Sequence, residues 1–185
     1  MIPKKYQKYK PEFLAQGKRG VVYKFTKDKK DYVIKVKKPS SEAEGRIENE
    51  AKFQKILNKH KIGMPLIDSS KTYLVREFAK GAMIKDYQGK LEPIFKQILK
   101  QCFILDQLKI NKLEMHKPLK HIIIHRNKAV MIDFERCYYT ERPKNVTQFC
   151  EYINRIKKRI PKKQIQEYKA SPSTKALSSL LSYLS

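Results

Sequence analysis

Residues 13–36 read FLAQGKRGVVYKFTKDKKDYVIKV, and this stretch decides how the first part of the chain folds. Apolar and polar residues alternate along Val21–Thr26 and again along Asp31–Val36, as they do in strands. Phe13–Ala15 adds a shorter strand, and bends containing glycine or several lysines separate the three. We therefore expect an antiparallel meander at the start of the chain.

Helical spacing replaces this alternation from about Ser41 to Lys59, where apolar residues recur among Glu and Lys. Two further strands, Pro65–Ile67 and Thr72–Phe78, are expected on either side of a polar turn at Asp68–Lys71. Five strands and one helix then form a first lobe, residues 1–79.

The second lobe, residues 80–185, is expected to be reduced and mainly helical. Pro93 opens a helix that ends at Ile110, and the apolar runs His121–Ile124 and Ala129–Ile132 predict a buried hairpin. From Asn145 onward the periodicity is again helical. The predicted fold class is α+β, within a single domain of two lobes.

Composition limits the classes of function. The chain has 185 residues, with 42 Lys and Arg against 18 Asp and Glu, a net charge of +24. A field of that sign attracts phosphates of nucleotides, RNA or acidic lipids. No apolar run approaches the roughly 20 residues that cross a bilayer and no signal region is visible, so we expect a cytoplasmic protein. The three cysteines lack a Cys-x-x-Cys pair and are expected to be reduced core thiols.

Residues 14–23, LAQGKRGVVY, place glycines where one predicted strand turns into the next. Backbone amides in such a turn can close over phosphates without a side chain between them. An ordinary hairpin turn is the alternative, since an alanine stands at the first position of the Gly-x-Gly-x-x-Gly pattern. The residues expected around a nucleotide here are Ala15, Gly17, Gly20 and Val22.

Lys35 lies on the next predicted strand, where an inward-pointing side chain would hold the α- and β-phosphates. The helix that follows carries Glu50, which is placed to form an ion pair with this lysine. Glu44 and Glu48 compete for that role. We favour Glu50 because the apolar residues that follow it at helical spacing put it on the buried face.

Two further segments carry candidate site residues. Leu74–Phe78 leads into the second lobe, and an extended connector there offers backbone donors and acceptors to an adenine edge at Glu77 and Phe78. Asp133 ends a buried strand with a carboxylate, which is a common way to present an oxygen ligand to Mg²⁺ beside phosphates. An edge strand and a capping aspartate are the structural alternatives.

In this order, the motifs from about Phe13 to Glu135 resemble the protein kinase-like fold. The resemblance is to the small atypical kinases of the Rio and KEOPS-associated type and to minimal prokaryotic serine/threonine kinases. It implies a bilobal fold with a truncated C-terminal lobe and an ATP- and Mg²⁺-dependent phosphotransferase or ATPase. It also implies a phosphate loop at Gly17 and Gly20, an ion pair of Lys35 with Glu50, an adenine hinge at Glu77 and Phe78, and the metal-binding Asp-Phe-Gly position at Asp133, with Glu135 in place of the glycine.

The catalytic loop departs from the kinase-like motif His-x-Asp-x-x-x-x-Asn, because residues 112–121 read KLEMHKPLKH. With a two-residue insertion Glu114 takes the Asp position, and without a gap His116 takes it. Both registers put His121 at the Asn position, where the family binds Mg²⁺. We favour Glu114 because a carboxylate accepts a proton at neutral pH, whereas His121 is a poor ligand for a metal that prefers oxygen.

The histidines also suggest zinc, through His116, His121 and His125 with Glu114. His121 and His125 are four residues apart on a predicted strand, which separates them by roughly 13 Å, too far to bind one metal ion. Loop histidines near phosphate are therefore the preferred interpretation.

Two basic runs suggest a second hypothesis, in which a degenerate kinase-fold module binds RNA or a ribonucleoprotein with little or no catalysis. The unusual Glu114, His121 and Glu135 support it, and Tyr6 and Tyr9 within the first run could stack on bases. A solvated face and an acidic membrane surface are the other interpretations. The basic residues are Lys4, Lys5, Lys8, Lys10, Arg155, Lys157, Lys158, Arg159, Lys162 and Lys163.

Overall fold

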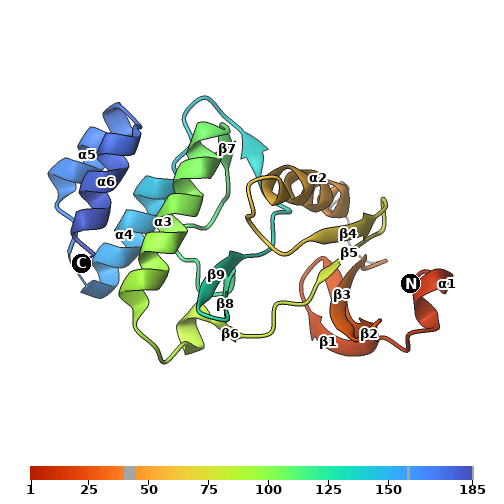
Figure 1. Ribbon diagram of the computed structural model, residues 1–185. Coiled ribbons are helices and arrows are strands. Elements are labelled where there is room, and N and C mark those ends of the chain that lie inside the picture. The colour runs from red at the N-terminus through yellow and green to blue at the C-terminus, as the bar shows by residue number, and fades with distance from the viewer. Residues whose placement is uncertain (40–44, 158, 185) are drawn as a thin grey trace. The chain divides into compact units, whose positions relative to one another are not determined.

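The computed structural model describes residues 1–39, 45–157 and 159–184, and the chain forms two compact units (Figure 1). The first unit comprises Met1–Ala79 together with Asp133–Arg136. The second comprises Lys80–Ile132 together with Cys137–Ser185. The segment Asp133–Arg136 thus belongs to the first unit although its neighbours in sequence belong to the second.

A five-stranded antiparallel sheet forms the body of the first unit, in the order β1-β2-β3-β5-β4. The antiparallel meander expected from residues 13–36 is confirmed. The expected turn at Asp68–Lys71 is wrong in part, because Asp68 and Ser69 pair with β5. The strands are β1 (Glu12–Gln16), β2 (Gly20–Lys27), β3 (Lys30–Lys37), β4 (Leu66–Ser69) and β5 (Tyr73–Glu77).

Helix α2 (Arg46–Asn58) packs against β3, β4 and β5. Its buried side includes Ile47, Phe53 and Leu57, which recur at helical spacing, and also Glu50, as the sequence predicted. The expected helix start at Ser41 lies outside the described residues.

The N-terminal segment covers a second apolar cluster of the same sheet. Successive strand residues point to opposite faces, so β3 contributes Ile34 and Val36 to this cluster. The segment, which includes the unexpected short helix α1 (Lys4–Gln7), packs Tyr6 and Tyr9 on it. The buried members are Phe25, Ile34, Val36, Tyr73 and Val75.

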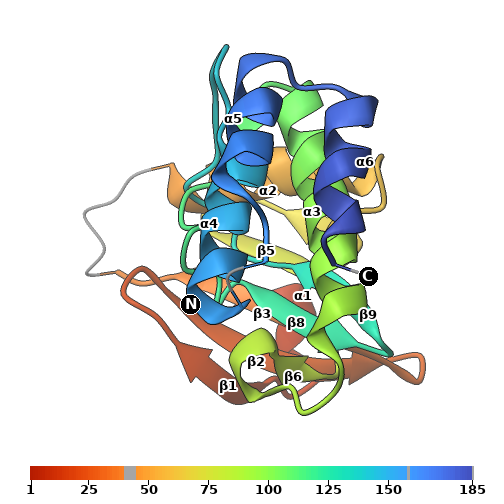
Figure 2. The same cartoon turned by 90° about the vertical axis from the view of Figure 1, so that its left-hand side faces the viewer.

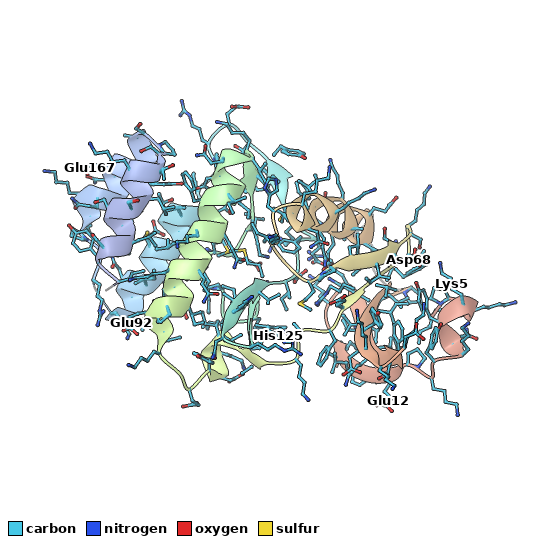
Figure 3. The ribbon with its side chains drawn as sticks, in the orientation of Figure 1. Lys5, Glu12, Asp68, Glu92, His125 and Glu167 are labelled. Carbon is cyan, nitrogen blue, oxygen red and sulfur yellow. The ribbon has the colours of Figure 1, made fainter. Side chains whose placement is uncertain are left out.

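Asp68 anchors this N-terminal segment (Figure 3). Its carboxylate accepts hydrogen bonds from Tyr6 Oη at 2.6 Å and Tyr73 Oη at 2.9 Å, and Lys5 Nζ lies at 2.7 Å. Burial opposes the charged form, but the hydrogen bonds from Lys5, Tyr6 and Tyr73 outweigh it and lower the pKa of Asp68. Lys5 and Tyr6 therefore serve the fold of the first unit.

The second unit consists of helices that lie side by side and two small sheets (Figures 1 and 2). The β8–β9 hairpin expected from the sequence is confirmed. Among the described residues, no helix combines the length and apolar character needed to span a membrane. The elements are β6 (Ala82–Met83), η1 (Ile84–Asp86), α3 (Leu91–Gln107), β7 (Ile110–Asn111), β8 (Ile122–His125), β9 (Lys128–Met131), β10 (Tyr138–Tyr139), α4 (Asn145–Lys157), α5 (Lys162–Ala170) and α6 (Thr174–Ser182).

The expected helix end at Ile110 is wrong. Helix α3 ends at Gln107, Lys109 adopts a left-handed conformation with φ of +58°, and Ile110 pairs with Tyr139 in the sheet formed by β7 and β10. An apolar residue at this position fits both the last turn of a helix and a short strand after it, so helical spacing alone did not distinguish the two.

Asp106 joins three helices of the second unit. It lies near the end of α3 and accepts hydrogen bonds from the backbone nitrogens of Asn145 at 3.1 Å and Val146 at 3.3 Å, which caps α4. Tyr168 Oη of α5 donates a further bond to it at 3.0 Å. Burial raises the pKa of Asp106. The three cysteines are free and buried, and their place in the core is as expected.

Gly81 leaves no room for a side chain, because an added Cβ would lie 1.9 Å from the carbonyl oxygen of Ile124. We expect Gly81→Ala to lower the free energy of unfolding by about 2 kcal/mol or more, since the backbone of β8 must shift. Gly17→Ala is the control, because its Cβ would meet only Gly20 O at 3.9 Å. Urea denaturation of both variants measures the difference, and equal stabilities would contradict the close approach of these backbones.

Candidate functional site

Lys35 lies on β3, on the face of the strand opposite to Ile34 and Val36. Gly20, at the start of β2, makes room for it. A Cβ on Gly20 would lie 3.0 Å from Val36 O and 3.4 Å from both Cγ and Cε of Lys35. The absence of a side chain at Gly20 therefore lets the lysine stem pass close to the backbone of β2.

Glu50 binds the Lys35 ammonium, with Nζ and Oε2 2.6 Å apart. The Glu50 side chain is only 2% exposed, and burial raises its pKa despite the nearby lysine. Burial would lower the pKa of Lys35, but Glu50, Asp133 and Glu135 together outweigh burial and raise it. The predicted ion pair is thus present, and Lys35 is held in its charged form.

Asp133 also reaches this lysine, with Oδ1 3.3 Å from Nζ. Its backbone has φ of +63°, in the left-handed region that aspartate and asparagine tolerate better than most residues. The two residues are 98 apart in sequence. The residue of the predicted Asp-Phe-Gly position therefore lies next to the predicted phosphate-binding lysine.

Glu135 is a third carboxylate at the same lysine, with Oε2 3.0 Å from Nζ. Its other oxygen, Oε1, accepts a hydrogen bond from Arg19 Nη1 at 2.6 Å. Among the described residues, only Glu50, Asp133 and Glu135 form a group of three or more side chains with ligand atoms within 4.8 Å of one another. Sequence reasoning treated Glu135 as a departure from the kinase-like motif and gave it no contact, and it assigned no role to Arg19, although an arginine within a predicted phosphate loop was the available signal.

The β1–β2 turn has one feature that differs from the expected phosphate loop. Gly17 N donates to Gly20 O at 2.9 Å, which closes the turn, so this amide already has a partner within the protein. Ala15 and Val22 lie opposite each other on β1 and β2. Of the two glycines, Gly20 is the one that the packing requires.

The expected hinge residues are bound into the sheet of the first unit. Glu77 N donates to Pro65 O at 3.0 Å, and Phe78 N donates to Asp31 O at 2.9 Å. Both amides are therefore used within the protein at the end of β5, and the assignment of Glu77 and Phe78 to an adenine hinge stays a prediction.

Glu114 and His121 pair within the second unit, with Oε2 and Nε2 2.6 Å apart. Glu114 has φ of +76°, a backbone conformation that costs a non-glycine residue about 1 kcal/mol or more and that is concentrated at functional sites. Ile132, the residue directly before Asp133, donates its backbone N–H to His121 O at 2.9 Å. His116, the alternative catalytic residue, is exposed on the same loop.

The histidines considered for zinc form no such ligand group within the described residues. His125 Nδ1 instead lies 2.8 Å from Lys80 O.

The two basic runs are partly used within the fold. Lys157 Nζ lies 2.5 Å and Arg159 Nη2 3.6 Å from Glu92 Oε1, in the same way that Lys5 binds Asp68. The Tyr9 ring stacks on Phe25 with centroids 5.5 Å apart. Lys158 lies outside the described residues. Stacking of bases on the N-terminal tyrosines is therefore not supported, since those rings pack on the sheet.

Comparison of the sequence finds no matching family model and no matching curated protein. Comparison of the structure finds the Rio2 kinase from Chaetomium thermophilum, with a TM-score of 0.66 and 12% identity, covering 96% of this chain and 73% of that chain. A complex of the same Rio2 kinase with ADP, Mg²⁺ and phosphoaspartate gives a TM-score of 0.64 and 11% identity, covering 96% of this chain and 72% of that chain.

The chain has a Rio-type protein kinase-like fold. The fold class expected from the sequence, α+β with a truncated kinase-like arrangement, is confirmed. At 11–12% identity the likeness concerns the fold alone.

The Lys35–Glu50 pair predicts a pH-dependent change in stability. In Lys35→Met, Glu50 stays buried without its closest cation, so its pKa in the folded state rises further above its value in the unfolded chain. When the pKa of a carboxyl group is higher in the folded state than in the unfolded chain, its contribution to the free energy of unfolding is complete at low pH. That contribution is lost as the pH rises through the pKa of the folded state. We expect Lys35→Met to be about 3 kcal/mol less stable than the wild type at pH 8 and to recover much of the difference at pH 5.

Urea denaturation between pH 5 and 8 measures this effect. The double variant Lys35→Met, Glu50→Gln is the matched control, since it has no buried carboxylate at position 50 to titrate. If Lys35→Met loses the same free energy of unfolding at every pH from 5 to 8, then Glu50 is not the buried group that loses its cation.

Proposed function

We propose that this protein binds ATP with Mg²⁺ at Lys35 and transfers the γ-phosphoryl group to a hydroxyl or to water, as an atypical serine/threonine kinase-like enzyme or ATPase. The observation that carries the proposal is the convergence of Glu50 at 2.6 Å and Asp133 at 3.3 Å on one lysine ammonium. The three residues come from β3, α2 and a segment far along the chain. Stability alone does not call for a buried charge network of this kind, and such networks are concentrated at functional sites.

The donor set suits these ligands. Mg²⁺ prefers hard oxygen ligands and keeps several waters, and Asp133 provides a carboxylate oxygen. Phosphate oxygens prefer an ammonium or guanidinium held in place, and Glu50 fixes the Lys35 ammonium through its 2.6 Å contact. When bound, ATP with Mg²⁺ supplies the reactive phosphoryl group and the neutralisation of its charge. A similar fold holds ADP and Mg²⁺ in the Chaetomium thermophilum complex, which supports the same use here.

The protein side chains then have distinct tasks. Glu50 keeps Lys35 charged and oriented, and Lys35 binds phosphate oxygens. Asp133 provides the carboxylate for the metal. Glu114 lies in the loop of residues 112–121, at the place of the catalytic aspartate in the kinase-like motif. This place supports Glu114 as the group that accepts or orients the proton of the attacking hydroxyl or water.

Two observations favour Glu114 over His116 as the residue that accepts or orients the proton. Glu114 occupies a left-handed backbone conformation and contacts His121 at 2.6 Å, so its side chain is held in one orientation. His116 is exposed. His121 contributes by orienting Glu114, and its assignment as a metal ligand is not retained because its Nε2 contacts that carboxylate.

Asp133→Asn is expected to reduce ATP turnover by about 100-fold or more, since loss of a carboxylate ligand removes several kcal/mol of charge stabilisation. Asparagine tolerates the φ of +63° at this position, so the fold is expected to remain intact. Asp28→Asn is the matched control, because Asp28 also has positive φ, +50°, but lies in the exposed β2–β3 turn.

Turnover is measured as release of ADP and of labelled γ-phosphate, with ATP and Mg²⁺ affinity measured by calorimetry. Unchanged turnover in Asp133→Asn would refute the proposal. Binding of ATP by the wild type without any turnover would favour the second hypothesis, a kinase-fold module that binds RNA or another anionic partner and no longer catalyses.

A further inference from the structure

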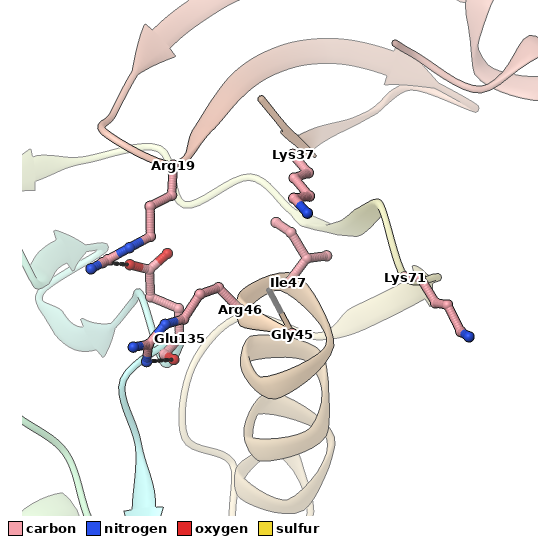
Figure 4. Close-up of a pocket in the computed structure, with 7 residues that line it drawn as sticks. All are labelled: Arg19, Lys37, Gly45, Arg46, Ile47, Lys71 and Glu135. Atoms are coloured by element: carbon pink, nitrogen blue, oxygen red, sulfur yellow. Dashed lines mark hydrogen bonds and ion pairs between the residues drawn. The ribbon is translucent and has the colours of Figure 1, made fainter. Parts of the chain in front are cut away.

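The carboxylate of Glu135 is divided between two cations, Lys35 and Arg19, and Figure 4 shows the contact with Arg19. Oε1 accepts from Arg19 Nη1 at 2.6 Å, and Oε2 accepts from Lys35 Nζ at 3.0 Å. The Glu135 side chain is 10% exposed, and the side chains of Lys35 and Arg19 are 17% and 27% exposed. One anionic group therefore fills the space between an ammonium and a guanidinium with little access to water.

Helix α2 fixes the backbone of Glu135 in this position. The carbonyl oxygen of Glu135 accepts from Asn49 Nδ2 at 3.0 Å and from Arg46 Nη1 at 3.3 Å, and Figure 4 shows the contact with Arg46. Arg46 thus binds a backbone oxygen while Arg19 binds the side chain. The placement of Glu135 depends on contacts at both ends of the residue.

A phosphoryl group resembles this carboxylate in the features that the two cations recognise. Both carry negative charge on oxygens that accept from separate donors, and arginine and lysine bind phosphate and carboxylate through the same atoms. Lys35 is already the proposed phosphate ligand. Arg19 belongs to the β1–β2 turn, between Gly17 and Gly20, which is the expected phosphate loop.

We propose that Glu135 occupies a phosphate position between Lys35 and Arg19, that Arg19 is a phosphate-binding residue, and that a polyphosphate ligand must displace the Glu135 carboxylate to bind. This inference rests on the proposed function, because the polyphosphate is taken to be that of ATP. It adds a ligand residue, Arg19, and an internal competitor, Glu135, at the site.

The charges at the site give the reason for competition. Lys35 and Arg19 face three carboxylates, those of Glu50, Asp133 and Glu135. A polyphosphate arriving with Glu135 in place would meet a like charge at contact distance, which disfavours binding. Movement of the Glu135 side chain off both cations frees Arg19 and one contact of Lys35 for the ligand, while Lys35 keeps its contacts with Glu50 and Asp133.

Inorganic tripolyphosphate is the probe, because its affinity reports the phosphate position without adenine recognition or turnover. Its binding is measured by calorimetry at about 0.15 M salt, which screens general attraction to a basic protein. The variants are Glu135→Gln, which keeps the size and removes the charge, and Arg19→Gln. Lys18→Gln is the matched control, since Lys18 is an exposed cation in the same turn.

We expect Glu135→Gln to bind tripolyphosphate about tenfold more tightly than the wild type and Arg19→Gln about tenfold more weakly, with Lys18→Gln within about twofold. Unchanged or weaker binding by Glu135→Gln would overturn the proposal, and so would equal losses in Arg19→Gln and Lys18→Gln. Absence of binding in every variant would also overturn it, since the loss of the competitor should open the site. Should Glu135→Gln not fold, as judged by thermal unfolding, the comparison of Arg19→Gln with Lys18→Gln decides.

ATP turnover measured in parallel separates this inference from the proposed function. Turnover by the wild type combined with unchanged tripolyphosphate affinity in Glu135→Gln removes the inference and leaves the enzyme assignment standing. Tighter tripolyphosphate binding by Glu135→Gln without turnover in the wild type removes the enzyme assignment and retains the phosphate position.

Discussion

The charge of Lys35 is the constraint on which the first unit depends. An ammonium that is largely removed from water is stable only when oxygen atoms replace its hydration, and Glu50 at 2.6 Å provides the nearest. Glu50 is itself buried, so each member of the pair needs the other in place. The contact between these two side chains therefore fixes helix α2 against strand β3.

The remaining site residues are arranged around this pair. Gly20 gives the lysine stem its path, and Asp133 and Glu135 bring the segment Asp133–Arg136 to the ammonium. Helix α2 contributes twice, through Glu50 and through the side chains of Arg46 and Asn49, which bind the Glu135 carbonyl oxygen. A segment of four residues thus belongs to the first unit through polar contacts that are specific to its side chains and backbone.

Net charge is a poor guide to the position of the candidate site in this protein. The +24 excess includes lysines that stabilise the fold, since Lys5 binds Asp68 and Lys157 binds Glu92. The residues that converge on Lys35 are acids, at a place where the sequence had suggested phosphate. This is physically reasonable, because a site for Mg²⁺ needs carboxylates and a site for phosphate needs a few oriented cations.

The sequence by itself determined the elements with a clear period: the meander of residues 13–36, the amphipathic α2 with Glu50 on its buried face, and the β8–β9 hairpin. It also singled out Lys35 and Asp133, because a charged residue at the end or middle of an apolar strand stands out against its neighbours. Only the tertiary structure decided that Glu135 divides its carboxylate between Lys35 and Arg19, and that the amides of Glu77 and Phe78 are used within the sheet. Periodicity reports which face of an element is buried, whereas contacts between residues about 100 apart depend on how the elements pack, and that information is not local in the chain.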